Sequence, residues 1–362
     1  MAVKETAAKV AIDRLIKKAR VHFYKPIQIA EILYRDRVHQ DIDLSDLETY
    51  RTRSKKWRDE VCEKFIGRVS SSSAKYQDNI FDRNAIPPEV LVTLARSNRD
   101  HAGVVEAYIY NAFRKRLSVM YEAVSYVEET GVARFELGAF LDLFWREPGL
   151  KRSIDKIYEI VVFALFSALV EALGVSVEVS VDPEKHDLLR EFSDFAALIV
   201  NLGPTRQRFR MGAKIHRVGV TNAADRGLDM FANFGLAIQI KHLSLTEEMA
   251  EGIVNGVTAD RIVIVCKDNE KNIIVSLLNQ IGWKSRIQSI VTEQNLVEWY
   301  RKALRGDFSG ALAANILERL CREIQLEFPS VQGAEFDAFF ARRDYSRPFG
   351  KSIWSVQDLL PR

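Results

Sequence analysis

Apolar side chains in the first part of the chain recur at intervals of three and four residues, the spacing of one helix face. In Ala7–Ala19, for example, Val10, Leu15 and Ile16 are apolar and charged residues stand between them. The same pattern predicts helices at Ile27–Tyr34, Glu89–Arg96, His101–Glu128 and Phe135–Phe144. Pro148-Gly149 then interrupts the pattern, and we place a domain boundary there. A mainly helical N-terminal domain is therefore expected over residues 1–150, and a second domain over residues 151–362.

The second part of the chain alternates between helical and extended patterns. Val175–Val181 places apolar and polar residues in turn, as in a strand with one buried face, and Arg261–Cys266 is almost continuously apolar, as in a strand buried on both faces. Further strands are predicted at Leu228–Phe234, Ala237–Leu243 and Arg286–Val291. Helices are predicted at Ile154–Leu173, Ser244–Val257, Lys271–Ile281, Glu293–Leu304 and Ala311–Phe328. This order predicts an α/β (α+β) fold, in which helices flank a mixed central sheet.

The composition narrows the class of protein without indicating a function. With 47% hydrophobic and 28% charged residues, the 362-residue chain can bury a core, which excludes a disordered or low-complexity protein. The net charge is only +3, from 52 basic and 49 acidic residues, so any contact with nucleic acid must depend on local basic patches.

The cysteines and the apolar runs indicate the compartment. Cys62, Cys266 and Cys321 are far apart in the sequence, so neither a disulfide framework nor a zinc site is expected. No apolar run reaches the roughly 18 residues that a membrane span needs, and the N-terminus has no signal-peptide core. We expect a cytoplasmic protein.

The segment with candidate chemistry runs from residue 224 to residue 241. Asp229 enters one predicted strand, and Gln239 and Lys241 lie on the next, where the period of two places both on one face. A turn near Gly235 would bring Asp229 beside them, so that a carboxylate, an amide oxygen and an ammonium group meet at one end of the sheet. Oxygen ligands of this kind suit Mg²⁺, and a lysine can orient a metal-activated water for phosphodiester hydrolysis. The alternative is a surface hairpin whose Asp and Lys face solvent.

This segment resembles the PD-(D/E)XK nuclease superfamily, in which an Asp begins one strand and a (D/E)-X-K triplet lies on the next. The resemblance covers roughly residues 154–292 and implies a restriction-endonuclease-like core. It implies that Asp229 is the principal metal ligand, that Gln239 is a second oxygen donor, and that Lys241 orients the attacking water. Leu228 replaces the proline of the motif, and Gln239 replaces its acid, which removes one negative charge from the metal site.

The resemblance also implies that the preceding helix supplies another carboxylate. Glu159 and Glu171 are the candidates, and we favour Glu159 because it lies nearer the start of the helix. The Mrr-like branch contains Q-X-K versions of the motif with a D-x-G-x-D run, to which Asp225–Asp229 is similar, so Asp225 is a secondary candidate.

At the scale of the whole chain, the sequence resembles the HaeII restriction-enzyme family. The segments that carry this resemblance are Ala19–Leu33 and Ser54–Asp59. It implies a homodimeric type II restriction endonuclease that uses Mg²⁺ to cut double-stranded DNA at a short GC-rich palindrome, beside a protecting DNA methyltransferase. The alternatives are a Mrr-like or repair nuclease acting on modified or branched DNA, and a DNA-binding protein whose nuclease core has lost activity.

Two basic segments are candidates for contact with DNA. Residues 201–217 contain no acid, and they directly precede the candidate catalytic strand. Arginine suits bidentate contact with phosphate and guanine, whereas a solvated loop explains the same run almost equally well. Arg51–Arg68, with Trp57, could follow a DNA backbone or could form a helix with its own ion pairs. The predicted DNA-binding residues are Arg206, Arg208, Arg210, Lys214 and Arg217.

Overall fold

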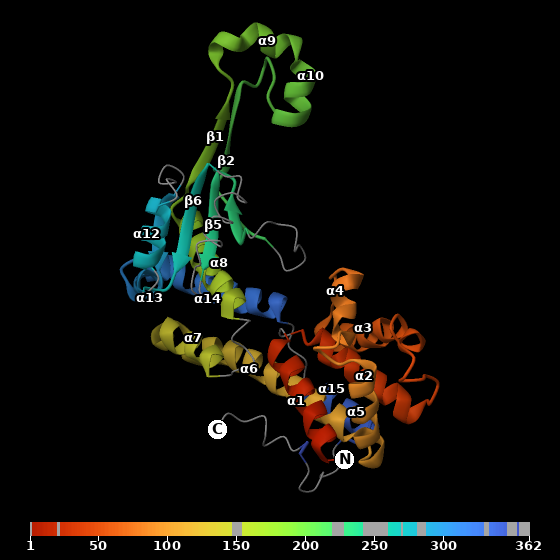
Figure 1. Cartoon of the computed structure of the whole chain (residues 1–362). Helices are drawn as coiled ribbons and strands as arrows, with labels where there is room; N and C mark the ends of the chain where they lie inside the picture. Colours follow the sequence, from red (N-terminus) through yellow and green to blue (C-terminus); the bar gives the residue numbers. More distant parts are fainter. Residues whose placement is uncertain are drawn as a thin grey trace. The chain divides into compact units, whose positions relative to one another are not determined.

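A computed structural model describes most of the chain and divides it into two compact units (Figure 1). The described residues are 2–19, 22–146, 154–218, 228–241, 260–268, 271–280, 287–328, 333–345 and 353–354. The first unit comprises residues 1–157 and 321–362, and the second comprises residues 158–320. The predicted division into domains at residues 1–150 and 151–362 stays a prediction. In the described part, no helix is long and apolar enough to cross a membrane.

Among the described residues of the first unit, all regular secondary structure is helical. Its central helix α2 is buried over most of its surface, including Ile27, Ile29 and Leu33, and α3 ends at Gly67, whose φ of 67° suits a glycine. The helical interpretation of Arg51–Arg68 is thus confirmed. The helices that lie within this unit are α1 (Ala2–Lys18), α2 (Tyr24–Val38), α3 (Arg53–Ile66), α4 (Ala74–Asp78), α5 (Pro88–Asp100), α6 (Val104–Arg134), α7 (Leu137–Trp145) and α15 (Gly333–Arg342). Short 3₁₀ turns, η1 (Leu47–Thr49) and η2 (Asn79–Phe81), lie between them.

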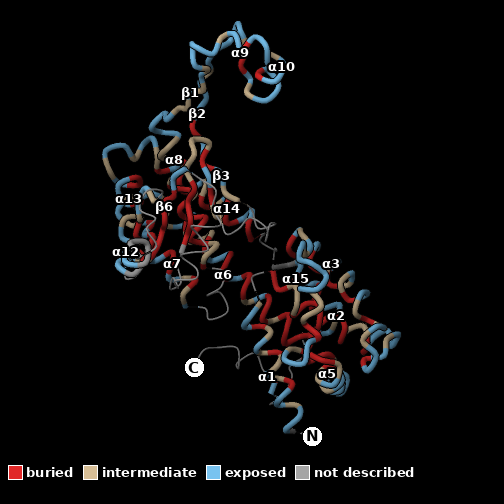
Figure 2. Tube along the Cα trace, turned by 45° about the horizontal axis from the view of Figure 1, so that its top comes forward, coloured by how far each residue is buried: buried red, intermediate tan, exposed pale blue. Residues whose placement is uncertain are grey.

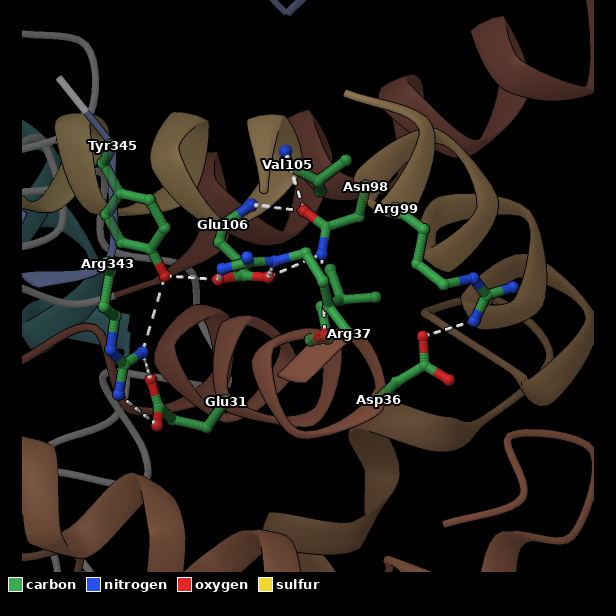
Figure 3. A network of polar contacts seen from close by, with 10 residues as sticks. Glu31, Asp36, Arg37, Asn98, Arg99, Val105, Glu106, Arg343 and Tyr345 are labelled. Atoms are coloured by element: carbon green, nitrogen blue, oxygen red, sulfur yellow. Dashed lines mark hydrogen bonds and ion pairs between the residues drawn. The ribbon is translucent and has the colours of Figure 1, made fainter. Parts of the chain in front are cut away.

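Helix α15, which the sequence analysis missed, joins the N-terminal helices through aromatic and polar contacts. Phe336 and Phe339 pack their rings against Phe65, at centroid distances of 4.4 and 5.0 Å. Just beyond the helix, Arg343 donates to both carboxylate oxygens of Glu31 over 2.6 and 3.0 Å (Figure 3). The segment from residue 333 to residue 345 is therefore part of the first unit's core.

The second unit is built on a five-stranded mixed sheet, which confirms the predicted fold class. The strand order is β3-β4-β5-β6-β7; the first three strands pair antiparallel and the last three parallel. Strand β6 is buried from Ile262 to Cys266, as its apolar run predicts. The strands are β3 (Ile215–Arg217), β4 (Met230–Ala232), β5 (Leu236–Lys241), β6 (Arg261–Cys266) and β7 (Ile287–Thr292). The associated helices are α8 (Ile154–Ala172), α12 (Lys271–Gln280), α13 (Glu293–Arg305) and α14 (Ser309–Glu327). The predicted helix Ser244–Val257 lies outside the described residues.

A two-stranded arm extends from the second unit, away from the five-stranded sheet (Figure 1). Its strands are β1 (Ser176–Ser180), which confirms the predicted strand, and β2 (Arg208–Gly212), which the sequence analysis did not predict. A small lobe of short helical segments connects them, and we call residues 182–202 the arm lobe. It contains η4 (Pro183–Lys185), α9 (His186–Glu191), α10 (Ser193–Phe195) and the π-helical turn η5 (Ala196–Val200).

All three cysteines are free thiols, as the sequence predicts. Burial raises the pKa of Cys62 well above its usual value. Burial also raises the pKa of Cys321 to about 11, and the nearby Glu128 adds to the shift. These two thiols are therefore protonated at neutral pH, the unreactive form of the side chain.

Candidate active site

Asp229 and Gln239, ten residues apart in the sequence, are in direct contact. Strands β4 and β5 pair antiparallel, with Met230 opposite Ile238, around a turn in which Gly235 has a φ of 81°. Asp229 directly precedes β4, and its Oδ2 accepts hydrogen bonds from Gln239 Nε2 (2.9 Å) and from the backbone N–H of Ile240 (2.7 Å). The structure thus brings together the carboxylate and the amide that strand periodicity places near each other.

Gln239 is 1% exposed, and its amide is only half satisfied. Because a carboxylate accepts hydrogen bonds and cannot donate them, the contact with Asp229 orients the NH₂ group toward Asp229 and the oxygen away from it. Within the described part of the chain, that oxygen, Oε1, is buried without a hydrogen-bond partner. Leaving a buried acceptor unpaired costs roughly 1–3 kcal/mol, which a cation or water at this position would offset.

Glu159 lies on α8 in the interior of the second unit. Its carboxylate is buried, and Oε2 is 4.0 Å from Nη1 of Arg217 on β3. Arg217 pairs in register with Met230, and the next residue, Val218, donates its N–H to the carbonyl oxygen of Asp229 over 2.9 Å. Glu159 thus lies beside Arg217, and Asp229 is bonded to the next residue, Val218, at the end of β3.

The two candidate glutamates of α8 have different surroundings. Glu171 is mostly exposed and forms an ion pair with Arg319 of α14, whereas Glu159 is buried beside Arg217. Of the two, Glu159 is the one beside β3, which pairs with the strand that Asp229 directly precedes. Among the residues that the structure describes, no three His, Cys, Asp or Glu side chains are grouped so as to hold a metal ion.

Two predicted site residues are described only in part or not at all. Lys241 ends β5 in register with Cys266 of β6, and the strand period places it on the same face as Gln239, but its side chain lies outside the described part. Asp225 lies outside the described residues.

The predicted DNA-binding residues fall into two groups. Arg208 and Arg210 are exposed on the polar face of the arm, where Arg210 Nε donates to Ser176 Oγ over 2.6 Å. Arg206 and Lys214 are exposed at the two ends of β2. Arg217, in contrast, is mostly buried beside Glu159.

Sequence reasoning missed two contacts of the site. The N–H of Ile240 holds Asp229 in place, and Arg217 lies beside Glu159. The first follows from the β4–β5 register, which the turn at Gly235 could have indicated. The second depends on how α8 packs against β3, for which the sequence carries no local signal.

A mixed sheet covered by helices, with a carboxylate entering one strand and a buried polar side chain on the next, is consistent with the restriction-endonuclease-like class of nucleases. The sequence model of the HaeII restriction endonuclease family matches residues 8–345, and the chain belongs to this family. It is a type II restriction endonuclease, as the resemblance implied.

Two relatives cover almost the whole chain. The type II restriction enzyme HaeII of Haemophilus aegyptius is 58% identical over 340 residues, which are 94% of this chain and 97% of the relative. The type II restriction enzyme NgoBI of Neisseria gonorrhoeae is 58% identical over 346 residues, 95% of this chain and 98% of the relative. No solved structure matches the chain. Family membership supports a restriction enzyme over a Mrr-like or repair nuclease and over an inactive DNA-binding protein.

Proposed function

We propose that this enzyme uses Mg²⁺ to hydrolyse phosphodiester bonds of double-stranded DNA at a short GC-rich palindrome. The observation that carries the proposal is the contact between Asp229 and Gln239, whose buried amide oxygen has no hydrogen-bond partner among the described residues. Enzymes of the type II class generally need a divalent metal. Carboxylate and amide oxygens are the hard ligands that Mg²⁺ prefers, so the residues present fit this ion.

In this proposal, Asp229 and the amide oxygen of Gln239 hold the metal, and Glu159 is an outer ligand. When bound, Mg²⁺ lowers the pKa of a water and offsets charge on the scissile phosphate. Lys241, on the same strand face as Gln239, orients that water and stabilises the developing negative charge. Asp225 and Glu171 are secondary candidates.

The same proposal covers the partners of the enzyme. A palindrome has twofold symmetry, so a homodimer presents one active site to each DNA strand. The exposed cations of the arm, Arg206, Arg208 and Arg210, with Lys214, would contact DNA. Arg217 is mostly buried beside Glu159, so we do not include it among these contacts. The helical N-terminal region, residues 1–150, would add DNA contacts, dimer surface or both. A DNA methyltransferase with the same specificity would protect host DNA in the cytoplasm.

Removal of the Asp229 carboxylate tests the site. We expect Asp229→Ala and Lys241→Ala each to lower the cleavage rate by about 10²–10³-fold or more, since each removes a charge that acts directly on the metal or the phosphate. DNA affinity without metal should stay within a few-fold of that of the unmodified enzyme. Plasmid digestion with Mg²⁺ or EDTA measures the first effect, and filter binding in EDTA measures the second.

Glu298→Ala is the matched control, because Glu298 pairs with Lys302 on the exposed face of α13 and should leave cleavage unchanged. Cleavage by Asp229→Ala at the normal rate would refute the proposed site. Sequencing of the fragment ends from wild-type digestion gives the recognition sequence, and ends without a GC-rich palindrome would refute that part of the proposal.

A further inference from the structure

The arm lobe exposes an unusual number of large apolar side chains. The least exposed of them is Phe192 at 51%, and the most exposed is Leu198 at 83%. Figure 2 shows most of the lobe exposed, with a few buried positions. The exposed apolar set comprises Leu188, Phe192, Phe195, Leu198 and Ile199.

These side chains follow a helical spacing. Leu188, Phe192, Phe195 and Ile199 are separated by four, three and four residues, which places them along one side of a nearly continuous helical path through α9, α10 and η5. The lobe's own core is small, since its buried apolar residues are Leu189, Ala196 and Leu202. We call these four side chains, together with Leu198, the stripe. It faces outward and is not part of the lobe's interior.

The exposed apolar area of the stripe is close to the area that one partner contributes to a standard protein interface. A large side chain such as phenylalanine offers roughly 150–250 Å², so the exposed parts of the five side chains leave on the order of 600 Å² of apolar surface. A monomer's largest apolar patch is roughly 300–600 Å². Each partner of a standard interface contributes about 800 Å². The stripe supplies most of such an interface from one small lobe.

The charge of the lobe argues against DNA as the partner of the stripe. Residues 182–202 contain five acidic and two basic side chains, a net charge of −3, which phosphates would repel. The ribbon that carries the lobe has a weakly basic face, because Arg208 and Arg210 of β2 lie opposite Ser180 and Glu178 of β1, two basic groups and one acidic group. The arm therefore combines a weakly basic stalk, which is the ribbon of β1 and β2, with an acidic end that carries the apolar stripe.

The ribbon itself also needs support. Its other face carries Val177, Val179, Phe209 and Met211, which oppose one another in register and are only partly covered. An isolated two-stranded ribbon is marginally stable in water unless further strands or helices cover it. An arm of this construction is better explained as one half of an assembly than as a free extension.

We propose that the arm lobe is the surface through which two copies of this chain pair, with the stripe of one copy packed against the stripe of the other. The proposal rests on the proposed function, because a palindromic target needs a twofold partner and a stripe that meets its own copy is self-complementary. Pairing by the lobes leaves Arg208 and Arg210 of both copies exposed on the stalks, where they can contact DNA.

The test is the double substitution Phe192→Ser/Phe195→Ser in the full-length enzyme. Sedimentation equilibrium over a range of concentrations should show a wild-type dimer, and the variant should dissociate at least about 30-fold more readily, because buried interface aromatics are typical hot spots. Phe308→Ser is the matched control, since Phe308 is 78% exposed on the same unit but lies outside the arm. Circular dichroism of all three proteins shows whether the fold is intact.

Salt provides a second readout. Two lobes of like charge repel each other, so raising the salt concentration should leave wild-type dimerisation unchanged or strengthen it. Dimerisation that weakens steeply with salt would overturn the proposal, since it would indicate that the acidic lobe binds a basic surface instead.

Two other outcomes overturn the proposal: a wild-type monomer at all concentrations, or a variant as dimeric as the wild type, whether or not it also loses DNA affinity. Digestion of the same plasmid with Mg²⁺ keeps this inference separate from the proposed function. Cleavage by an enzyme whose lobe variants remain dimeric refutes the lobe pairing alone, whereas a dimer without Mg²⁺-dependent cleavage refutes the proposed function alone.

Discussion

The amide of Gln239 donates to the Asp229 carboxylate over 2.9 Å, and no described residue pairs with its oxygen. An acid at this position, as in the (D/E)-X-K motif, would place two carboxylates within contact distance in a buried site. Without a metal, such a pair repels, and one of the two must take up a proton. In the proposed metal site, glutamine therefore has a second effect besides removing a charge: it would stabilise the site when the metal is absent.

This argument predicts the behaviour of Gln239→Glu. In EDTA at neutral pH, we expect the variant to lose about 1–3 kcal/mol of stability, because a hydrogen bond becomes a repulsion between carboxylates. In Mg²⁺ the variant should recover more stability than the wild type gains, since it has one more anionic ligand. Thermal unfolding with EDTA or Mg²⁺ measures both effects.

Gln294→Glu, an exposed substitution near the start of α13, serves as the control and should shift stability by under about 0.5 kcal/mol in either solution. If Gln239→Glu is as stable as the wild type in EDTA, the amide does not relieve a repulsion at this site.

At the scale of elements, the helices and strands that could be predicted from the sequence are those whose apolar pattern lies within the element itself. The apolar run of β6 and the three-and-four spacing of α6 need no knowledge of the rest of the fold. Strand β2 was missed because its arginines resemble a solvated loop, although Arg208-Phe209-Arg210-Met211 alternates as a strand does. Residues 208–212 form a strand because they pair with β1, which is separated from them in the sequence by the arm lobe. The contact of Glu159 with Arg217 has the same origin, since it is set by packing between distant elements.

With the proposed function, the alternation of β2 predicts how the arm would contact DNA. Since Arg208 and Arg210 are exposed on one face, Arg208→Ala and Arg210→Ala should each weaken binding to specific and nonspecific DNA alike, and each should lower the salt dependence of binding by about one unit of slope. Titrations of labelled duplexes at several salt concentrations measure this slope. Lys302→Ala is the control, because Lys302 pairs with Glu298 on α13. Loss of affinity at one DNA sequence only would instead indicate that these arginines read bases.

At the scale of the whole molecule, the chain's two ends belong to one unit. Residues 321–362 group with the N-terminal helices, although the sequence pattern places the C-terminal helices after the nuclease core. The C-terminal segment joins the N-terminal helices through polar contacts as well as aromatic packing, because the buried carboxylates of Glu31 and Glu106 need hydrogen-bond and ion-pair partners. Arg37 and Asn98 hold Glu106 together with Tyr345, while Arg343 holds Glu31 (Figure 3). No local pattern could reveal an ion pair between residues 31 and 343.

Because Arg343 pairs with Glu31 of α2, we expect it to contribute strongly to the free energy of unfolding, although it lies near the end of the chain. Burial opposes the charged guanidinium, but Glu31 and its neighbours outweigh this effect and raise the pKa of Arg343, so the guanidinium stays charged across the accessible pH range. Arg343→Ala leaves the buried Glu31 without its cationic partner, with the hydroxyl of Tyr110 still donating to it. This loss should cost about 3–5 kcal/mol of the free energy of unfolding, as measured by urea denaturation. Arg114→Ala breaks the exposed pair with Asp337 and should cost under about 1 kcal/mol. Equal losses in the two variants would mean that the C-terminal segment covers the first unit without holding it together.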